Sequence, residues 1–213
     1  MKPESNSGDS FVKTVPPGGE LVYVHDWIDP ESADNMFMAL RSEVDWQTRT
    51  IRMFGKVMTQ PRKIAFQGDP GIGYVYSGGL YRAVPWHPAV AGLRDALASD
   101  TDCKFNCALL NLYRDERDSM GWHSDDEPEL GRDPTIASVS LGASRRFVLR
   151  SKDDKRRRFE LVPGHGSLIL MRGDLQHHWQ HQLPKLTRAA EPRINITFRK
   201  IVRPPKSVAN PSA

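Results

Sequence analysis

The chain has 213 residues, of which 38% are hydrophobic and 26% are charged, and its formal net charge is +4. These values are typical of one globular domain, and they exclude a chain that is disordered throughout or that depends on disulfides. No apolar stretch is long enough to cross a bilayer, so we expect no membrane partner, whereas the small positive charge permits a polyanionic one.

Both ends of the chain are expected to be unstructured. Residues 1–19 are polar and rich in Ser, Pro and Gly, and they lack the apolar core of a secretory signal, so we expect a disordered tail. Residues 203–213 contain several Pro and Ser and are expected to form a flexible tail. The segment between them, residues 20–202, is expected to fold as a single domain.

The first half of this domain mixes strands with two helices. Residues 20–24 alternate like a short strand, and a helix is expected over residues 30–45, because Asp29-Pro30 suits an N-cap followed by Pro at the first helical position. Residues 46–77 are expected to form short strands interrupted by Gly and Pro, and residues 88–99 a second helix. The helical residues expected to face the core are Ala33, Phe37, Leu40 and Val44 in the first helix, and Val90, Leu93 and Leu97 in the second.

From residue 104 onwards only strands are expected. They cover residues 104–113, 136–141, 146–150, 157–162, 166–171 and 193–202. Two early helices followed by such a series predict an α+β fold, in which helices buttress one sheet of a β-sandwich. Cys103 and Cys107 are interpreted as reduced thiols, because their spacing in an apolar run suits neither a disulfide nor a zinc site.

The sequence Trp122-His123-Ser124-Asp125 contains a candidate pair of metal ligands. On an extended segment His123 and Asp125 point to the same side and can bind one ion together. A third ligand is available from His177, His178 or His181, and two His with one carboxylate form the facial triad of non-haem iron(II) oxygenases. The alternative is a surface pair next to ordinary polar histidines, and the tripeptide alone does not exclude it.

The segment Arg193–Arg199 alternates strictly between polar and apolar residues. Arg193, Asn195, Thr197 and Arg199 share one face, while the Ile and Phe residues between them share the other. If both faces are covered, two arginines are buried and need an anion, and a dicarboxylate between them would satisfy both guanidinium groups. An edge strand with its polar face in solvent is the alternative.

A third short motif, Asn111-Leu112-Tyr113, again puts two polar side chains on one face, and each can donate a hydrogen bond to the same anion. In chain order, this motif, His123-x-Asp125, a distal His and the segment from Arg193 to Arg199 resemble the AlkB-type dioxygenases, close to the branch that acts on duplex DNA. The resemblance extends over most of the chain from Pro61 to Val202. It includes intervening stretches such as residues 136–142 and 165–168.

This resemblance implies both a fold and a chemistry. The fold is a double-stranded β-helix (jelly-roll) over about residues 104–202, with a nucleotide-recognition lid over about residues 46–85. The metal is iron(II), held by His123, Asp125 and His181, where His181 is favoured because Leu183-Pro184 follows it. The co-substrates are 2-oxoglutarate and O₂, and succinate, CO₂ and formaldehyde are released as a base loses its methyl group. The residues expected to hold or line the 2-oxoglutarate site are Asn111, Tyr113, Arg193, Asn195, Thr197 and Arg199.

Oxidation of a base in a duplex requires the base to be extruded and gripped by its π-face, and the resemblance suggests the residues for this. We expect Tyr76 and the ring of His123 to clamp the base, with Tyr74 nearby, although Tyr74 can equally be a packing residue. Asp126 and Glu127 are expected to contact an exocyclic amine. Phe54 is expected to insert into the base stack, or else to be an ordinary packed hairpin residue.

Three basic patches are candidates for contacts with nucleic-acid phosphates, although solvated charge is the usual explanation for such runs. The residues concerned are Arg62, Lys63, Arg145, Arg156 and Arg157.

We therefore expect a monomeric demethylase of alkylated DNA, with RNA as a second possible substrate, that acts in a bacterial cytoplasm or a eukaryotic nucleus. The other classes considered are the same chemistry on tRNA, protein or a small molecule, a non-enzymatic binding jelly-roll, and a zinc hydrolase. The hydrolase would leave Arg193 and Arg199 without a task.

Overall fold

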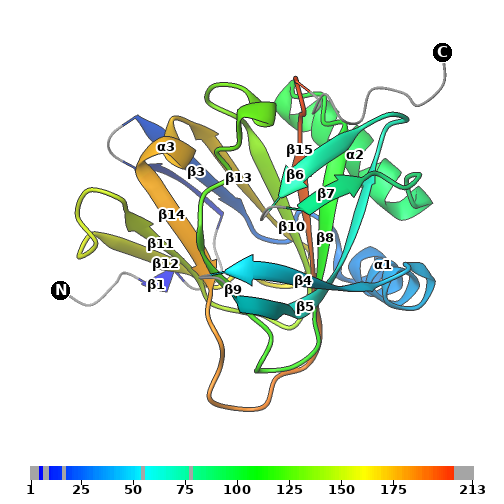
Figure 1. Ribbon diagram of the computed structural model, residues 1–213. Helices are drawn as coiled ribbons and strands as arrows, with labels where there is room; N and C mark the ends of the chain where they lie inside the picture. Colours follow the sequence, from blue (N-terminus) through cyan, green and yellow to red (C-terminus); the bar gives the residue numbers. More distant parts are fainter. Residues whose placement is uncertain (1–4, 7–9, 16–17, 54–55, 77–78, 204–213) are drawn as a thin grey trace.

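The computed structural model describes residues 5–6, 10–15, 18–53, 56–76 and 79–203. Two large β-sheets lie face to face, and two helices cover the outer side of the larger sheet (Figure 1). This arrangement confirms the predicted α+β jelly-roll with buttressing helices.

In the described ranges the larger sheet has eight strands. In spatial order they are β2 (Phe11–Val15), β3 (Gly19–Val24), β13 (Ser167–Gly173), β10 (Ile136–Gly142), β15 (Arg193–Arg199), β8 (Cys107–Tyr113), β5 (Lys56–Gly68) and β4 (Gln47–Met53). All neighbouring pairs are antiparallel. Every residue of β8 and of β15 is buried, because other layers cover both faces of the sheet at its centre.

The smaller sheet has five strands within the part of the chain that the structure describes. In spatial order they are β1 (Ser5–Asn6), β12 (Arg158–Leu161), β11 (Phe147–Ser151), β14 (Trp179–Leu183) and β9 (Met120–His123). A separate hairpin is formed by β6 (Gly73–Tyr76) and β7 (Gly79–Arg82), and two short helical turns, η1 (Pro128–Leu130) and α3 (Leu175–His178), occur in the connections. The smaller sheet supplies one wall of the space between the sheets, and the central strands of the larger sheet supply the other.

The two long helices begin where the sequence predicts. In α1 (Pro30–Glu43) the carboxylate of Asp29 accepts the N–H of Ser32, and Pro occupies the first turn. In α2 (Pro88–Thr101) the ring of His87 takes the capping role, and the left-handed Asp102, at φ 54°, ends the helix. The predicted ends differ by two residues in each helix, which is within the usual fraying of helix termini.

Two apolar layers hold the fold together. Alternation along β15 sends Ile194, Ile196 and Phe198 toward the helices, where they pack with Leu40 and Leu97. Burial of each such side chain contributes about 1.5–3 kcal/mol. The second layer lies between the sheets and is interrupted by the polar half of β15. The fold therefore surrounds a row of polar side chains that the sequence places on a single face.

The described part of residues 1–19 differs from the expected disordered tail. β2 pairs with β3 at one edge of the larger sheet, and β1 pairs in parallel with β12 at one edge of the smaller sheet. Phe11 packs against Tyr23 and Phe159, with ring centroids 5.5 and 5.9 Å away. The expectation of disorder is wrong for these strands, because their partners lie far along the chain. The predicted tail over residues 203–213 lies outside the described residues except for residue 203.

Candidate active site

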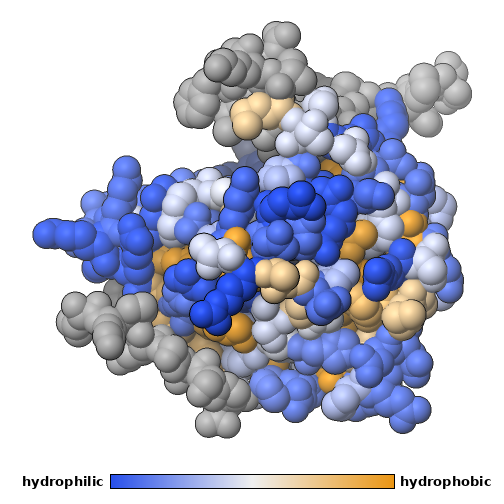
Figure 2. Space-filling view, turned by 90° about the horizontal axis from the view of Figure 1, so that it is seen from below, coloured by the Kyte–Doolittle hydropathy of each residue, from blue (hydrophilic) through white to orange (hydrophobic). Residues whose placement is uncertain are grey.

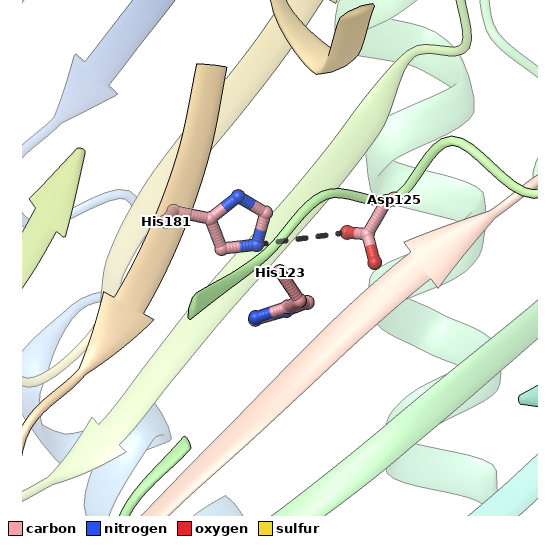
Figure 3. A group of neighbouring side chains, drawn as sticks. All are labelled: His123, Asp125 and His181. Carbon is pink, nitrogen blue, oxygen red and sulfur yellow. Dashed lines mark ion pairs between the residues drawn. The ribbon is translucent and has the colours of Figure 1, made fainter. Parts of the chain in front are cut away.

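The structure brings His123, Asp125 and His181 together between the two sheets. His123 ends β9, Asp125 follows in the adjoining loop, and His181 lies in the middle of β14, directly opposite His123 (Figure 3). One ligand atom from each residue lies within 4.8 Å of the others. The rival histidines of α3 point elsewhere, since His177 contacts Asp133 at 3.0 Å and His178 contacts Asp174 at 3.4 Å.

The protonation states of the triad suit metal binding. Burial lowers the pKa of His123 and lowers that of His181 to about 3, so both rings are neutral at neutral pH. The Nδ1 atom of His123 lies 2.9 Å from the carbonyl of Gly121 and must donate to it, which leaves the lone pair on Nε2. Burial alone would raise the pKa of Asp125, but the guanidinium of Arg199 and the neighbouring imidazoles hold it at about 2. The site thus offers two neutral imidazoles and one carboxylate.

The carboxylate of Asp125 divides its two oxygens between different tasks. Oδ1 accepts a hydrogen bond from Nη2 of Arg199 at 2.7 Å. Oδ2 is buried, has no hydrogen-bond partner among the described residues, and lies 4.0 Å from Nε2 of His181. The backbone N–H of Asp125 donates to the buried Gln176, which fixes the loop. An oxygen that is buried and aimed at an imidazole fits a metal ligand, so the residues present suit iron(II).

Zinc accepts the same three ligands, so the triad alone does not show whether the site binds iron or zinc. The residues of the surrounding cavity distinguish between an oxygenase and a zinc hydrolase. The triad opens into a cavity that contains all the side chains predicted to line the 2-oxoglutarate site. These are Asn111, Tyr113, Arg193, Asn195, Thr197 and Arg199. They come from β8 and β15, which are adjacent in register, with Asn111 opposite Asn195 and Tyr113 opposite Arg193. The structure places all six residues beside the triad. Their binding of 2-oxoglutarate stays a prediction.

Arg193 is the feature of this cavity that most requires a ligand. Its side chain is 2% exposed, and its Nη2 donates to Ser140 Oγ at 2.9 Å. It forms no ion pair with any described residue, and its Nε has no hydrogen-bond partner among them. Burial lowers the pKa of Arg193 to about 10, which still leaves it charged at neutral pH. A buried cation without a protein carboxylate fits a site for an anionic ligand.

The polar residues between the two arginines are bonded to one another. Nδ2 of Asn195 donates to Ser138 Oγ at 2.7 Å and to the carbonyl of Val139 at 3.0 Å, and Oγ1 of Thr197 donates to Oδ1 of Asn195 at 3.0 Å. This network fixes the face of β15 between the guanidinium groups. It also explains why Ser138 is a buried polar residue, and the hydrogen bond from Arg193 explains the same for Ser140. Sequence reasoning missed both serines.

Comparison with known proteins shows the family to which this chain belongs. The family model described as the 2OG-Fe(II) oxygenase superfamily matches residues 20–199. The chain belongs to this superfamily. Its AlkB-type character is shown by curated relatives: it is 40% identical over 189 residues to "Alpha-ketoglutarate-dependent dioxygenase alkB homolog 3" of Bos taurus, covering 84% of this chain and 65% of the relative. It is 41% identical over 180 residues to "DNA oxidative demethylase ALKBH2" of Homo sapiens, covering 80% of this chain and 69% of the relative.

The chain spans 65% of the length of the bovine relative that it matches. Among solved structures, "The structure of OsALKBH1" superimposes with a TM-score of 0.63 at 14% identity, covering 89% of this chain and 99% of that one, which supports the fold. Iron(II) and 2-oxoglutarate, the predicted cofactor and co-substrate, are those of the family, and the triad can form the iron site.

The predicted substrate contacts of the oxygenase are only partly described. Phe54 lies outside the described residues, and so do the side chains of Tyr74 and Tyr76, whose backbone belongs to β6. Asp126 is exposed, and its carboxylate accepts a hydrogen bond from Nζ of Lys152 at 2.8 Å. Glu127 is half-buried and precedes η1. The substrate roles of all these residues stay predictions.

Two of the predicted phosphate contacts are wrong. Arg145 is 1% exposed and donates to the backbone carbonyls of Asp115, Asp118 and Pro184, so its guanidinium joins two loops and cannot reach a phosphate. Arg62 is 4% exposed and donates to Asn111 inside the protein. The remaining candidates are more accessible. Lys63 is half-buried, whereas Arg156 and Arg157 are exposed in the β11–β12 hairpin.

Sequence reasoning also missed two residues around the metal ligands. Gln176 is fully buried and holds the backbone of Asp125, and Lys152 joins Asp126 to the carbonyl of Gln176. Neither residue type signals such a role by spacing, because the contacts join loops that are distant in sequence. In the described part of the chain, no helix is long and apolar enough to cross a membrane.

Proposed function

We propose that this oxygenase uses iron(II), 2-oxoglutarate and O₂ to demethylate N-alkylated bases such as 1-methyladenine and 3-methylcytosine in DNA. The observation that carries the proposal is the buried Arg193, without a carboxylate partner among the described residues, in the same cavity as the triad. A co-substrate with two carboxylates accounts for that cation, and a zinc hydrolase does not. RNA is a second substrate to be tested.

The chemistry divides between the bound groups and the protein. When bound, iron and 2-oxoglutarate together supply the activation of O₂ that oxidises the methyl group, which then leaves as formaldehyde. His123, Asp125 and His181 would hold the metal. Arg193 orients one carboxylate of the co-substrate, and Arg199 fixes Asp125 at the opposite end of β15. The protein thus orders the reactants in a cavity whose polar lining residues are mostly buried.

The nucleic-acid substrate is supported by the names of the relatives and by the hydrophilic character of one face of the molecule. One group of relatives carries the name DNA oxidative demethylase. The face seen in Figure 2 is mainly hydrophilic, with hydrophobic residues in small separated areas, which suits a polar partner. We further propose that the enzyme acts as a monomer, in the cytoplasm if the source is bacterial and in the nucleus if it is eukaryotic.

The direct test is turnover with defined oligonucleotides. The protein is purified without oxygen and incubated with iron(II), 2-oxoglutarate, O₂ and an oligonucleotide that carries 1-methyladenine or 3-methylcytosine. Loss of one methyl mass with an equal amount of succinate, dependent on iron, is the expected result. Succinate without demethylation would instead favour the same chemistry on tRNA, protein or a small molecule. Neither product, from folded and iron-loaded protein, would contradict the proposed chemistry.

The exposed hairpin gives a prediction for DNA affinity. Replacing Arg156 and Arg157 together by alanine is expected to weaken DNA binding, because both side chains are exposed and positively charged. Arg156 contacts Asp154 at 3.2 Å and Arg157 donates to Ser151 at 3.2 Å, but both arginines lie at the surface, where a phosphate can compete for these contacts. The slope of log affinity against log salt concentration should fall by about two, close to one for each lost phosphate contact. Fluorescence anisotropy over a salt series measures this slope. Arg41→Ala, on the exposed side of α1, is the matched control, and an equal change in that variant would exclude a hairpin-specific contact.

Phe54, which the sequence predicts to enter the base stack, gives a prediction for strand preference. Phe54→Ala is expected to reduce demethylation of duplex DNA about tenfold more than that of single-stranded DNA, because a wedge residue is needed only where a stacked base has to be displaced. The comparison uses the same lesion and sequence context in both forms, with rates measured at saturating 2-oxoglutarate. Equal losses on the two substrates would show that Phe54 has a packing role.

A further inference from the structure

Arg62 is a buried arginine that belongs neither to the metal triad nor to the lining of the cavity. It lies in β5, and its guanidinium forms no ion pair with any described residue. Its Nε donates to Oδ1 of Asn111 at 2.7 Å, in a contact that is itself buried. Asn111 lies in the neighbouring strand β8 and lines the cavity that contains Arg193 and the metal triad.

An irregularity in β5 directs Arg62 toward this contact. Thr59 of β5 pairs with Thr50 of β4, and Lys63 pairs with Thr48, so three residues of β5 face a single residue of β4. The extra residues include Pro61, which has no N–H for the ladder and whose carbonyl accepts from the N–H of Ser119 at 2.9 Å. Bulges of this kind bend a strand and re-aim a side chain. Beyond the bulge, β5 returns to regular pairing with β8, so Arg62 is held beside Asn111.

The chemistry of the contact fixes the orientation of the Asn111 amide. A guanidinium can only donate hydrogen bonds, so the amide must present its oxygen to Arg62. The amide nitrogen of Asn111 then points away from Arg62 and remains available as a donor in the cavity. With the amide reversed, its oxygen would face an incoming carboxylate, and an attractive contact would become a repulsive one.

We propose that Arg62 is a positioning residue for 2-oxoglutarate, which acts by holding the Asn111 amide with its nitrogen toward the co-substrate. The inference rests on the proposed function, because it assigns 2-oxoglutarate to the cavity. The contact between Arg62 and Asn111 joins the predicted nucleotide-recognition lid, to which β5 belongs, to β8 of the jelly-roll. The strand that carries Arg62 therefore contributes to co-substrate affinity without lining the cavity itself.

The test measures 2-oxoglutarate binding directly, without turnover. The 213-residue protein loaded with manganese(II) is titrated with 2-oxoglutarate in a calorimeter. We expect Arg62→Met to raise Kd about tenfold, as for the loss of one charge-assisted hydrogen bond. Arg62→Lys, which keeps a buried donor, should restore much of the affinity. Arg172→Met is the matched control, because Arg172 pairs with Glu20 on the distant strands β13 and β3, and its Kd should equal that of the wild type.

A double-mutant cycle separates positioning from a general structural effect. If Arg62 acts through Asn111, the Arg62→Met/Asn111→Ala protein should bind no more weakly than Asn111→Ala alone. Additive losses, or an unchanged Kd in Arg62→Met, would overturn the inference. If Arg62→Met does not fold, as judged by circular dichroism, the same cycle is run with Arg62→Ala, which also removes the donor to Asn111 but leaves room for water. If the wild type itself fails to bind 2-oxoglutarate, the proposed function is overturned, which is a different result from either of these.

Discussion

Replacing Asp125 by alanine is expected to lower turnover by more than about a thousandfold, because the metal would lose its only carboxylate ligand and with it several kcal/mol of transition-state stabilisation. The change should also reduce the free energy of unfolding by about 3 kcal/mol, since the buried guanidinium of Arg199 would lose its carboxylate. Succinate formation and denaturant unfolding measure the two effects, and the metal content of the purified variant shows whether a ligand has been lost.

The control for this prediction is Asp125→Asn. Its amide oxygen can still accept the hydrogen bond of Arg199, so we expect it to retain more of the stability than Asp125→Ala while losing the anionic metal ligand. Turnover should remain low in both variants. An Asp125→Ala protein that keeps its metal and forms succinate at the wild-type rate would remove Asp125 from the metal centre.

Replacing Arg193 by methionine is expected to separate binding from stability. The requirement for 2-oxoglutarate should rise about tenfold to a hundredfold, since hydrogen bonds to charged groups contribute about 1.5–3 kcal/mol each. The protein without co-substrate should lose no stability and can gain some, because an unpaired buried cation is replaced by an apolar side chain of similar length. Thermal unfolding with manganese(II), in the presence and absence of 2-oxoglutarate, measures both effects at once.

Arg193→Lys is the informative companion variant. Lysine keeps the charge but lacks the planar fork that binds a carboxylate through two hydrogen bonds, so an intermediate requirement is expected. An unchanged 2-oxoglutarate requirement in Arg193→Met would remove this residue from the co-substrate site. A large loss of stability without co-substrate would show that Arg193 has a structural role through Ser140.

Much of the site could be predicted from the sequence, because its residues follow the periods of regular structure. The alternation of residues 193–199 gave the polar cavity wall, and the spacing of His123 and Asp125 gave two of the three ligands. The third, distal ligand could not be identified from the spacing of residues. Three histidines were available, and only the family resemblance favoured His181, which β14 then aligns with His123. Strand β14 was not predicted, because one of its three buried residues is His181, at a position where the strand pattern requires an apolar residue.

The incorrect predictions share a physical cause. A run of basic residues is usually exposed, so Arg62 and Arg145 were assigned to phosphates, yet both are buried and donate to groups that are distant in sequence. Gln176 and Lys152 act in the same way, through contacts between loops. Periodicity reports which face of an element is apolar, but it carries no information about which distant polar atom a buried side chain reaches.

The pairing of β1 and β2 has a consequence for handling the protein. These strands occupy one edge of each sheet, where they satisfy backbone donors and acceptors of β12 and β3. A shortened chain that begins at residue 18 would keep every predicted ligand, yet it would expose two strand edges to solvent. Exposed edges of this kind pair with other copies of the same chain. The residues least involved in the chemistry thus protect the protein against self-association and precipitation.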